Sequence, residues 1–287
     1  MIVEDLSEYI SLHTLSMSES TLLHSSDIFY QIINFEYYGS SLESIPMDFI
    51  ESNHFHRLQL SCQRINEVNW NEVIDVYDFM VSSCDNITQL NLGKKVKILN
   101  ASYCRNLTSI EGILPGHYFE SVELGSTKLT DYSIFANSNY LNLRECSTLI
   151  DISPFANIQY LILSNSSKIE DFSCLGKQKY LDLSWLSQLR NEDLHYLSNV
   201  SYLRITNCPS ITSLDSLVNN HVIVADNCPG LIDVHLHGHC YQRLSFRHCT
   251  HLKDLRFSHP EEIRLISLSI YSTLLKEEDF SSFLDFA

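Results

Sequence analysis

The sequence has few of the features that mark an enzyme active site. Only eight glycines occur in 287 residues, so glycine-rich loops that hold phosphate groups are scarce. The patterns G-x-G-x-x-G, G-x-x-x-x-G-K-[ST], G-x-S-x-G and H-E-x-x-H, which mark nucleotide, hydrolase and metalloprotease sites, do not occur. We therefore predict that the protein is not an enzyme, with no catalytic residues and no cofactor.

Long apolar runs and a basic N-terminal cluster are also missing. The apolar run over residues 222–225 is far too short to span a bilayer. The chain starts MIVEDLSEYI, with acidic residues where a secretion signal carries lysine or arginine. These two absences predict a cytoplasmic protein that has no membrane partner.

Basic residues are outnumbered throughout the N-terminal third. The chain has 19 Lys and Arg against 35 Asp and Glu, and only Arg57 and Arg64 are basic within residues 1–90. An electrostatic field of this sign repels phosphate backbones. We therefore expect no nucleic acid partner, and we interpret the acidity as a charged face that keeps the protein soluble.

One short pattern recurs along most of the chain. The segments YLNL, YLIL and YLDL begin at Tyr140, Tyr160 and Tyr180, which are 20 positions apart. Extended in both directions, the pattern gives thirteen units of about 20 to 23 residues, each with two apolar residues two positions apart. These pairs are Leu15/Met17, Phe35/Tyr37, Leu58/Leu60, Phe79/Val81, Leu99/Ala101, Val122/Leu124, Leu141/Leu143, Leu161/Leu163, Leu181/Leu183, Leu203/Ile205, Ile223/Ala225, Leu244/Phe246 and Ile263/Leu265.

The alternation predicts a repeat solenoid. Apolar residues two apart define a short strand with one inward face, and a unit of this length cannot cover that face alone. Stacked units give a parallel sheet on one side and a return path on the other. Asp and Ser in the return segments that begin at Asp131, Asp151 and Asp171 favour tight turns. We expect turns and short 3-10 segments there, and a short helix over residues 191–197.

The cysteines follow the same repeat and form no C-x-x-C pair. Six of the nine occupy one position of the unit, which Thr127, Ser166 and Leu186 take in other units: Cys84, Cys104, Cys146, Cys208, Cys228 and Cys249. A position that recurs once per unit puts its members in a row, whereas zinc needs ligands that converge on one point. We predict buried, reduced thiols, which suit a reducing compartment.

These units resemble the leucine-rich repeat family, whose strand segment is L-x-x-L-x-L-x-x-N/C-x-L. Units such as Asn207-Cys-Pro-Ser-Ile look like the cysteine-containing variety found in substrate receptors of ubiquitin ligases, and their lengths are nearer those of internalin-type arrays. The resemblance implies a horseshoe with a parallel β-sheet on the concave side and turns or short 3-10 segments on the convex side. It implies function poorly, because this scaffold has many roles.

The domain organisation expected is a single leucine-rich repeat domain over residues 1–287. The repeats take up residues 14–270. The ends of a solenoid expose apolar surface, so we assign residues 1–13 as an N-terminal cap and residues 271–287 as a C-terminal cap. Apolar residues at helical offsets in both segments favour this assignment.

The residue before the first inward leucine is tyrosine in four successive units. Because neighbouring parallel strands lie about 4.8 Å apart, Tyr140, Tyr160, Tyr180 and Tyr202 should form a row of rings on the outward face. Tyrosine is enriched in protein interfaces, so this row is the predicted partner-binding surface. The alternative is that the rings only shield one another and the sheet.

Other outward positions add to the predicted surface. Asn142, Ile162, Asp182 and Arg204 lie between the paired apolar residues of their units, and Arg247 follows the second apolar residue of its own unit. Arginines give the C-terminal part of this face a basic character that an acidic or phosphorylated segment would match; they are Arg204, Arg243, Arg247 and Arg264. The alternative is that these arginines are solvated and partly paired with Asp226 and Glu262.

A histidine cluster is the one candidate for a metal site. His235, His237 and His239 alternate, and Cys240, His248, His251 and His259 follow. The repeat places the first three on the return side, and nothing in the pattern makes the ligands converge. We therefore predict no metal site and interpret the cluster as a histidine-rich surface.

Three functions remain in order of preference. The first is a non-enzymatic interaction module that binds a protein or peptide on the sheet face. The second is a substrate-recognition adaptor of a ubiquitin ligase, which would need an N-terminal docking segment where residues 1–40 carry repeats instead. The third is a metal-binding protein that uses the histidine cluster. The sequence does not indicate the oligomeric state.

Overall fold

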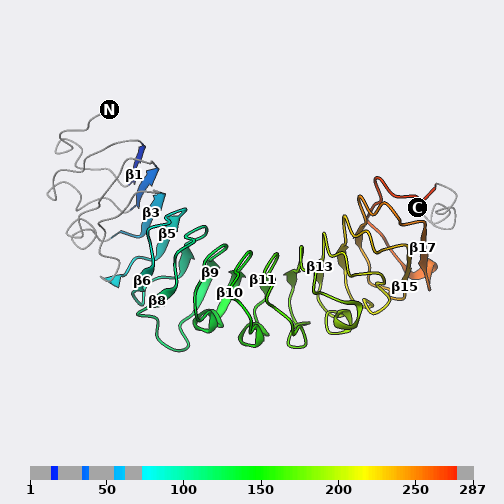
Figure 1. Cartoon of the computed structure of the whole chain (residues 1–287), viewed down its shortest axis with the longest axis horizontal. Helices are drawn as coiled ribbons and strands as arrows, with labels where there is room; N and C mark the ends of the chain where they lie inside the picture. Colours follow the sequence, from blue (N-terminus) through cyan, green and yellow to red (C-terminus); the bar gives the residue numbers. More distant parts are fainter. Residues whose placement is uncertain (1–13, 19–33, 39–54, 62–72, 277–287) are drawn as a thin grey trace. The chain divides into compact units, whose positions relative to one another are not determined.

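The computed structural model describes residues 14–18, 34–38, 55–61 and 73–276 (Figure 1). The chain divides into two compact units, one up to Thr148 and one from Leu149 onward. The predicted N-terminal cap and residues 277–287 of the predicted C-terminal cap lie outside the described residues. The assignment of one domain with two caps stays a prediction.

Parallel strands, one per repeat, form the main sheet of each unit (Figure 1). In the first unit the order follows the sequence: β1 (Thr14–Ser18), β2 (Asn34–Tyr38), β3 (Arg57–Ser61), β5 (Asp78–Ser82), β7 (Ile98–Asn100), β9 (Phe119–Glu123) and β10 (Ser138–Asn142). In the second unit it does so again: β11 (Tyr160–Ile162), β12 (Tyr180–Asp182), β13 (Tyr202–Arg204), β14 (Val222–Val224), β16 (Arg243–Ser245) and β18 (Ser267–Ser269).

The paired apolar residues point into each solenoid, as the alternation predicts. Leu161 pairs with Leu181, and Leu181 with Leu203, and all three side chains are fully buried. In the first unit Leu99 pairs with Val122, and both are fully buried as well. Each rung therefore covers the inward face of its neighbours, which confirms the predicted solenoid with a parallel sheet on one side.

The last predicted unit is wrong. The strand β18 pairs Leu268, not Ile263, with Leu244. A 3-10 helix at Pro260–Glu262 lengthens the return path before this strand, so the strand begins later than a regular repeat would place it. Arg264 therefore lies outside the sheet, and the predicted basic surface loses that member.

A left-handed turn ends each strand of the regular units. The residue that precedes the cysteine position has φ between 54° and 65° in ten units, with Asn165, Asn207 and Asn227 among them. Its backbone N–H donates to a carbonyl of the following repeat; that of Asn165, for example, reaches the Ser184 oxygen at 2.9 Å. Asparagine tolerates this conformation well, because its short polar side chain bonds locally.

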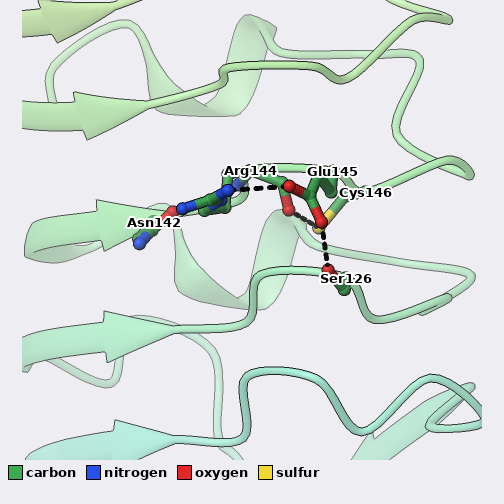
Figure 2. Close-up of polar contacts among 5 residues, drawn as sticks. All are labelled: Ser126, Asn142, Arg144, Glu145 and Cys146. Carbon is green, nitrogen blue, oxygen red and sulfur yellow. Dashed lines mark hydrogen bonds and ion pairs between the residues drawn. The ribbon is translucent and has the colours of Figure 1, made fainter.

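The cysteine position is buried beside this turn, as predicted. Cys104 donates its thiol to the Val81 carbonyl at 3.2 Å and Cys249 donates to the Ala225 carbonyl at 3.1 Å, one repeat back in each case. Cys146 does the same with the Leu124 carbonyl at 3.3 Å. Figure 2 shows the Cys146 thiol beside the Arg144 carbonyl, which is 3.7 Å from it. Burial raises the pKa of the Cys228 thiol to about 12, so the thiol stays protonated and keeps its role as a donor.

The return side contains the turns and short helices expected. The 3-10 helices are Ser133–Phe135, Ser153–Phe155, Asn191–His195 and Pro260–Glu262. Asp131, Asp151 and Asp171 each accept the backbone N–H two residues on, at 2.7 to 2.9 Å. Hydrogen bonds from the side chains of Ser153 and Ser173, and then from their backbone N–H groups, lower the pKa of Asp151 and of Asp171. These bonds confirm that the Asp and Ser of these segments form tight turns.

Two small return-side sheets were not predicted. One consists of β4 (Val73–Ile74), β6 (Gln89–Leu92) and β8 (Ser109–Glu111), and the other of β15 (Asp233–Leu236) and β17 (Asp254–Phe257). Buried and outward positions alternate in β6, β15 and β17; in β15, for example, Val234 and Leu236 are buried and the residues before them point outward. Where the return segments of two successive repeats both alternate buried and outward residues, the segments pair as strands and do not form turns.

Candidate functional site

The outward face of the second unit brings three of the four predicted tyrosines together. Tyr160 pairs in register with Tyr180, and Tyr180 with Tyr202. The rings of Tyr180 and Tyr202 are 4.9 Å apart at an angle of 34°, and Tyr160 is 39% exposed. Tyr140 lies in the first unit on β10, where it pairs with Ser121 of β9. We call Tyr160, Tyr180 and Tyr202 the tyrosine row.

The Tyr180 phenol is uncharged at neutral pH. Burial, with the nearby Asp182 carboxylate as a second cause, raises the pKa of Tyr180 above its ordinary value. A neutral phenol offers a flat apolar ring and one hydroxyl that both donates and accepts. The row is therefore suited to pack against the side chains of another protein and to give a few directed hydrogen bonds.

The predicted residues between the inward leucines differ in their availability. Asp182 is 9% exposed, and its carboxylate accepts the Ser184 backbone N–H at 2.9 Å. Asn142 makes the equivalent bond to Arg144 at 3.1 Å in the first unit. These two side chains help to form the turn that ends the strand. Ile162 is half-buried and Arg204 is exposed, so both can contact a partner.

Trp185 is an exposed aromatic residue that the sequence reasoning did not include. It lies at the left-handed turn position after β12, with φ of 65°, and it is 60% exposed. The repeat imposes the left-handed conformation at this position, and tryptophan tolerates it less well than asparagine does. The sequence did contain a signal for Trp185, because residue 185 stands directly before the cysteine position of its repeat, which Leu186 occupies.

Changing Trp185 to asparagine should raise the free energy of unfolding by about 0.5 to 1 kcal/mol, because asparagine tolerates the left-handed conformation. Asn165 and Asn207 already occupy this position in the adjacent repeats. Equilibrium urea unfolding of the two proteins measures the change. Asn207→Ala removes an asparagine from the same position in the next repeat, and it should destabilise the protein. A Trp185→Asn protein that is less stable than wild type would contradict the argument.

The C-terminal half of the face has exposed arginines, but not the predicted ion pairs. Arg243 and Arg247 are exposed, and the Arg247 guanidinium donates to the Ser269 hydroxyl at 3.3 Å. Asp226 accepts the Ser245 hydroxyl at 2.6 Å and the Arg247 backbone N–H at 2.8 Å. Glu262 pairs with His239 at 2.8 Å. Both carboxylates thus have partners other than an arginine side chain, and the arginines keep their charge toward solvent.

The first three histidines of the cluster, His235, His237 and His239, lie on the return side, as predicted. His235 and His237 are on or next to β15, with ring centres 4.2 Å apart, and the Ser258 hydroxyl lies 2.7 Å from His237 Nδ1. Within the described ranges, no group of three or more His, Cys, Asp or Glu could hold a metal ion. His235 and His237 contact each other and Ser258, and His239 contacts Glu262 and His259. His248 packs against Tyr271, and His251 lies at hydrogen-bond distance from the Pro229 carbonyl.

No helix in the described part of the chain is both long and apolar enough to cross a membrane. No family model matches the sequence. No curated protein matches it either.

Solved structures with a similar arrangement include three proteins of Listeria monocytogenes. An internalin, inlF, is 16% identical, covers 69% of this chain and 77% of its own, and has a TM-score of 0.38. The functional domain of InlJ, which includes a cysteine ladder, is 16% identical over 94% of this chain and 65% of its own, with a TM-score of 0.46. Internalin C2 is 16% identical over 65% of this chain and 81% of its own, with a TM-score of 0.33.

Likeness at this level carries no argument about partners. The fold follows from its own geometry: one parallel strand per repeat, a left-handed turn after it, a buried cysteine position and a short return segment. The fold is that of a leucine-rich-repeat solenoid.

Proposed function

We propose that the protein is a non-enzymatic interaction module that binds a segment of another protein on the outward face of its second unit. The observation that supports this is the tyrosine row, in which Tyr180 and Tyr202 contact each other and Tyr160 is partly exposed. Large aromatic rings on a solvent-facing sheet supply contact area at little cost in conformational entropy. The exposed indole of Trp185 lies after the same strand as Tyr180.

The chemistry of this face changes along the strands. Tyrosines and Ile162 occupy β11 to β13, the half-buried Val222 and Val224 follow on β14, and the exposed Arg243 and Arg247 come last. An aromatic and aliphatic surface with a cationic end fits a partner segment that has apolar side chains followed by acidic or phosphorylated residues. We propose a partner of this composition.

The other two functions have less support. An adaptor of a ubiquitin ligase needs a docking segment near the N-terminus, and the repeat strands β1 and β2 occupy part of that stretch. The metal-binding function finds no group of ligands among the described residues. The cytoplasmic location and the absence of nucleic acid and membrane partners stay predictions.

The proposal is tested with a triple variant, Tyr160→Ala, Tyr180→Ala and Tyr202→Ala. Partners captured from native lysate by the wild-type protein are identified, and binding of the most enriched one is then measured with purified proteins. We expect the triple variant to bind at least roughly tenfold more weakly, because truncating aromatic residues at the centre of an interface removes much of its binding energy.

The matched control is a double variant, Ile150→Ala and Ile232→Ala. Both isoleucines are exposed residues of the same unit and lie outside the strands of the sheet. This variant should bind the partner as the wild type does. Equal affinity of the triple variant and the wild type, with both proteins folded by circular dichroism, would reject the assigned surface.

A further inference from the structure

A polar hollow lies in the first unit, at the ends of β5, β7, β9 and β10. Its volume is about 350 Å³, and its lining includes Ser82, Asn100, Tyr103, Glu123, Asn142 and Arg144. We call it the strand-end hollow. Of its residues, the sequence reasoning named only Asn142 as part of a binding surface.

The strand-end hollow exists partly because one repeat has no side chain at the position after its second inward residue. Gly125 stands where neighbouring repeats have Ser102 and Arg144. A Cβ at Gly125 would lie 2.9 Å from Arg144 Cγ, so only glycine leaves the Arg144 side chain in its place. Figure 2 shows Arg144 reaching across to Glu145, which in turn binds Ser126.

Three side chains form the middle of the strand-end hollow in adjacent register positions. Asn100 pairs with Glu123, and Glu123 with Asn142. The Oδ1 atom of each asparagine accepts the backbone N–H two residues on, at 3.0 Å for Asn100 and 3.1 Å for Asn142. The amide oxygens are therefore occupied, and the Nδ2 groups are left as donors on either side of a carboxylate.

Glu123 is the one carboxylate lining the strand-end hollow, and it is half-buried. No hydrogen bond or ion pair between described residues satisfies it. The nearby Arg144 pairs instead with Glu145 at 2.7 Å, and Glu145 also accepts the Ser126 hydroxyl at 2.7 Å. These two partners lower the pKa of Glu145, so the pair stays charged and its charges offset each other.

This arrangement selects the charge of a ligand. An anion such as phosphate would be repelled by the Glu123 carboxylate, because Arg144 is already neutralised by Glu145. A cation would satisfy Glu123 but would offer no acceptor to the asparagine Nδ2 groups. A neutral ligand with neighbouring hydroxyls satisfies both, since each hydroxyl can donate to the carboxylate and accept from an amide.

Tyr103 completes the site with an apolar surface. It is 39% exposed and occupies the left-handed turn position after β7, with φ of 63°. The repeat imposes this turn, and Tyr103 is among the residues that line the strand-end hollow. Its ring gives a flat face against which C–H groups pack.

We propose that the strand-end hollow binds a sugar unit. Glu123 and the asparagine amides of Asn100 and Asn142 hold neighbouring hydroxyls, and the Tyr103 ring packs against the apolar face of the sugar. The volume is at the lower end of the roughly 300 to 1,000 Å³ typical of ligand pockets, which suits a ligand of one or two rings. The site is independent of the protein-binding face proposed above.

The test is titration of the full chain with glucose, galactose, mannose and N-acetylglucosamine, followed by saturation-transfer NMR. We expect saturable binding of at least one sugar. Glu123→Gln keeps the shape of the side chain but removes the charge, and it should weaken that binding about tenfold or more, as expected for loss of a hydrogen bond to a charged group. Tyr103→Asn, which suits the left-handed turn, should also weaken it.

Two controls separate this site from the rest of the molecule. Glu111→Gln makes the same chemical change at an exposed residue of β8, outside the strand-end hollow, and should bind the sugar as the wild type does. The triple variant of the tyrosine row should also bind the sugar normally, so failure of one proposal does not carry over to the other.

Three results would overturn the assignment. The first is the absence of saturable binding for all four sugars up to their solubility limits, and the second is equal binding by the wild type and Glu123→Gln. The third is saturable, Glu123-dependent binding of Nα-acetyl-lysine amide in place of the sugars, which would make the strand-end hollow a subsite for a basic peptide side chain.

Discussion

Replacing Leu181 by alanine should lower the free energy of unfolding by about 3 kcal/mol, as found for fully buried leucines that leave a cavity. Leu181 is fully buried in a rung between Leu161 and Leu203, and it is covered by both neighbours. Because each repeat is stabilised only by the repeats beside it, a cavity at one rung weakens two interfaces. Equilibrium unfolding in urea, followed by circular dichroism, measures the loss.

The matched control is Ile162→Ala on the outward side of the adjacent strand. Ile162 pairs with Asp182, one position after Leu161, and is half-buried. Ile162→Ala should lower the free energy of unfolding by no more than about 1 kcal/mol, since the site stays open to solvent and no closed cavity forms. Equal losses for the two variants would show that the inward and outward positions are misassigned, and the fold argument would fail with them.

The regular repeats could be predicted because each one has the same three constraints. The side chains of Leu181 and Leu183 must both point inward, and residue 185 must adopt the left-handed conformation. The side chain at the cysteine position must be small or apolar enough to be buried. A shift of one residue would move every inward side chain of the strand to the outward face. Alternation together with the 20-residue spacing therefore leaves one register for these units.

The last repeat was mispredicted because its sequence offers two equivalent alternations. Ile263 and Leu265 are two apart, and so are Leu268 and Ile270. Alternation alone cannot choose between them, and the shorter spacing favoured the first pair. The 3-10 helix at Pro260–Glu262 uses the extra residues and selects the second pair.

The candidate sites depended on features that a single sequence shows only in part. The tyrosine row was found because position in the repeat decides which side chains point outward. The strand-end hollow was missed because it depends on which polar groups are already bonded: Asn142 and Asp182 serve the backbone, whereas Glu123 does not. Such partners are a property of the folded turn, and spacing does not reveal them.

The second large effect is expected at Gly176 on the return side of the second unit. Its φ of +125° lies where residues with a side chain are strained, and a Cβ would lie 2.2 Å from the Tyr196 carbonyl oxygen. Gly176→Ala should therefore lower the free energy of unfolding by about 3 to 4 kcal/mol, as backbone strain and steric overlap add together. Urea unfolding of the full chain measures this loss.

The neighbourhood of Gly176 explains why the structure cannot relax around a methyl group. The Gly176 N–H donates to the Gln178 side-chain oxygen at 2.8 Å, and the Gln178 amide nitrogen donates to the Ala156 carbonyl at 3.1 Å. Gln178 is buried, so moving this turn would leave polar groups without partners, which costs about 1 to 3 kcal/mol per group. Hydrogen exchange should consequently become faster at these bonds in the variant.

Gly116→Ala separates strain from overlap. Gly116 also has a positive φ, of +80°, but no heavy atom lies within 4 Å of a Cβ built there. Gly116→Ala should lower the free energy of unfolding only by the strain of the left-handed conformation, which is about 1 to 2 kcal/mol. If the two alanine variants were equally stable, the close approach of Gly176 to Tyr196 would not constrain the fold, and the buried Gln178 bridge would be free to shift with the turn.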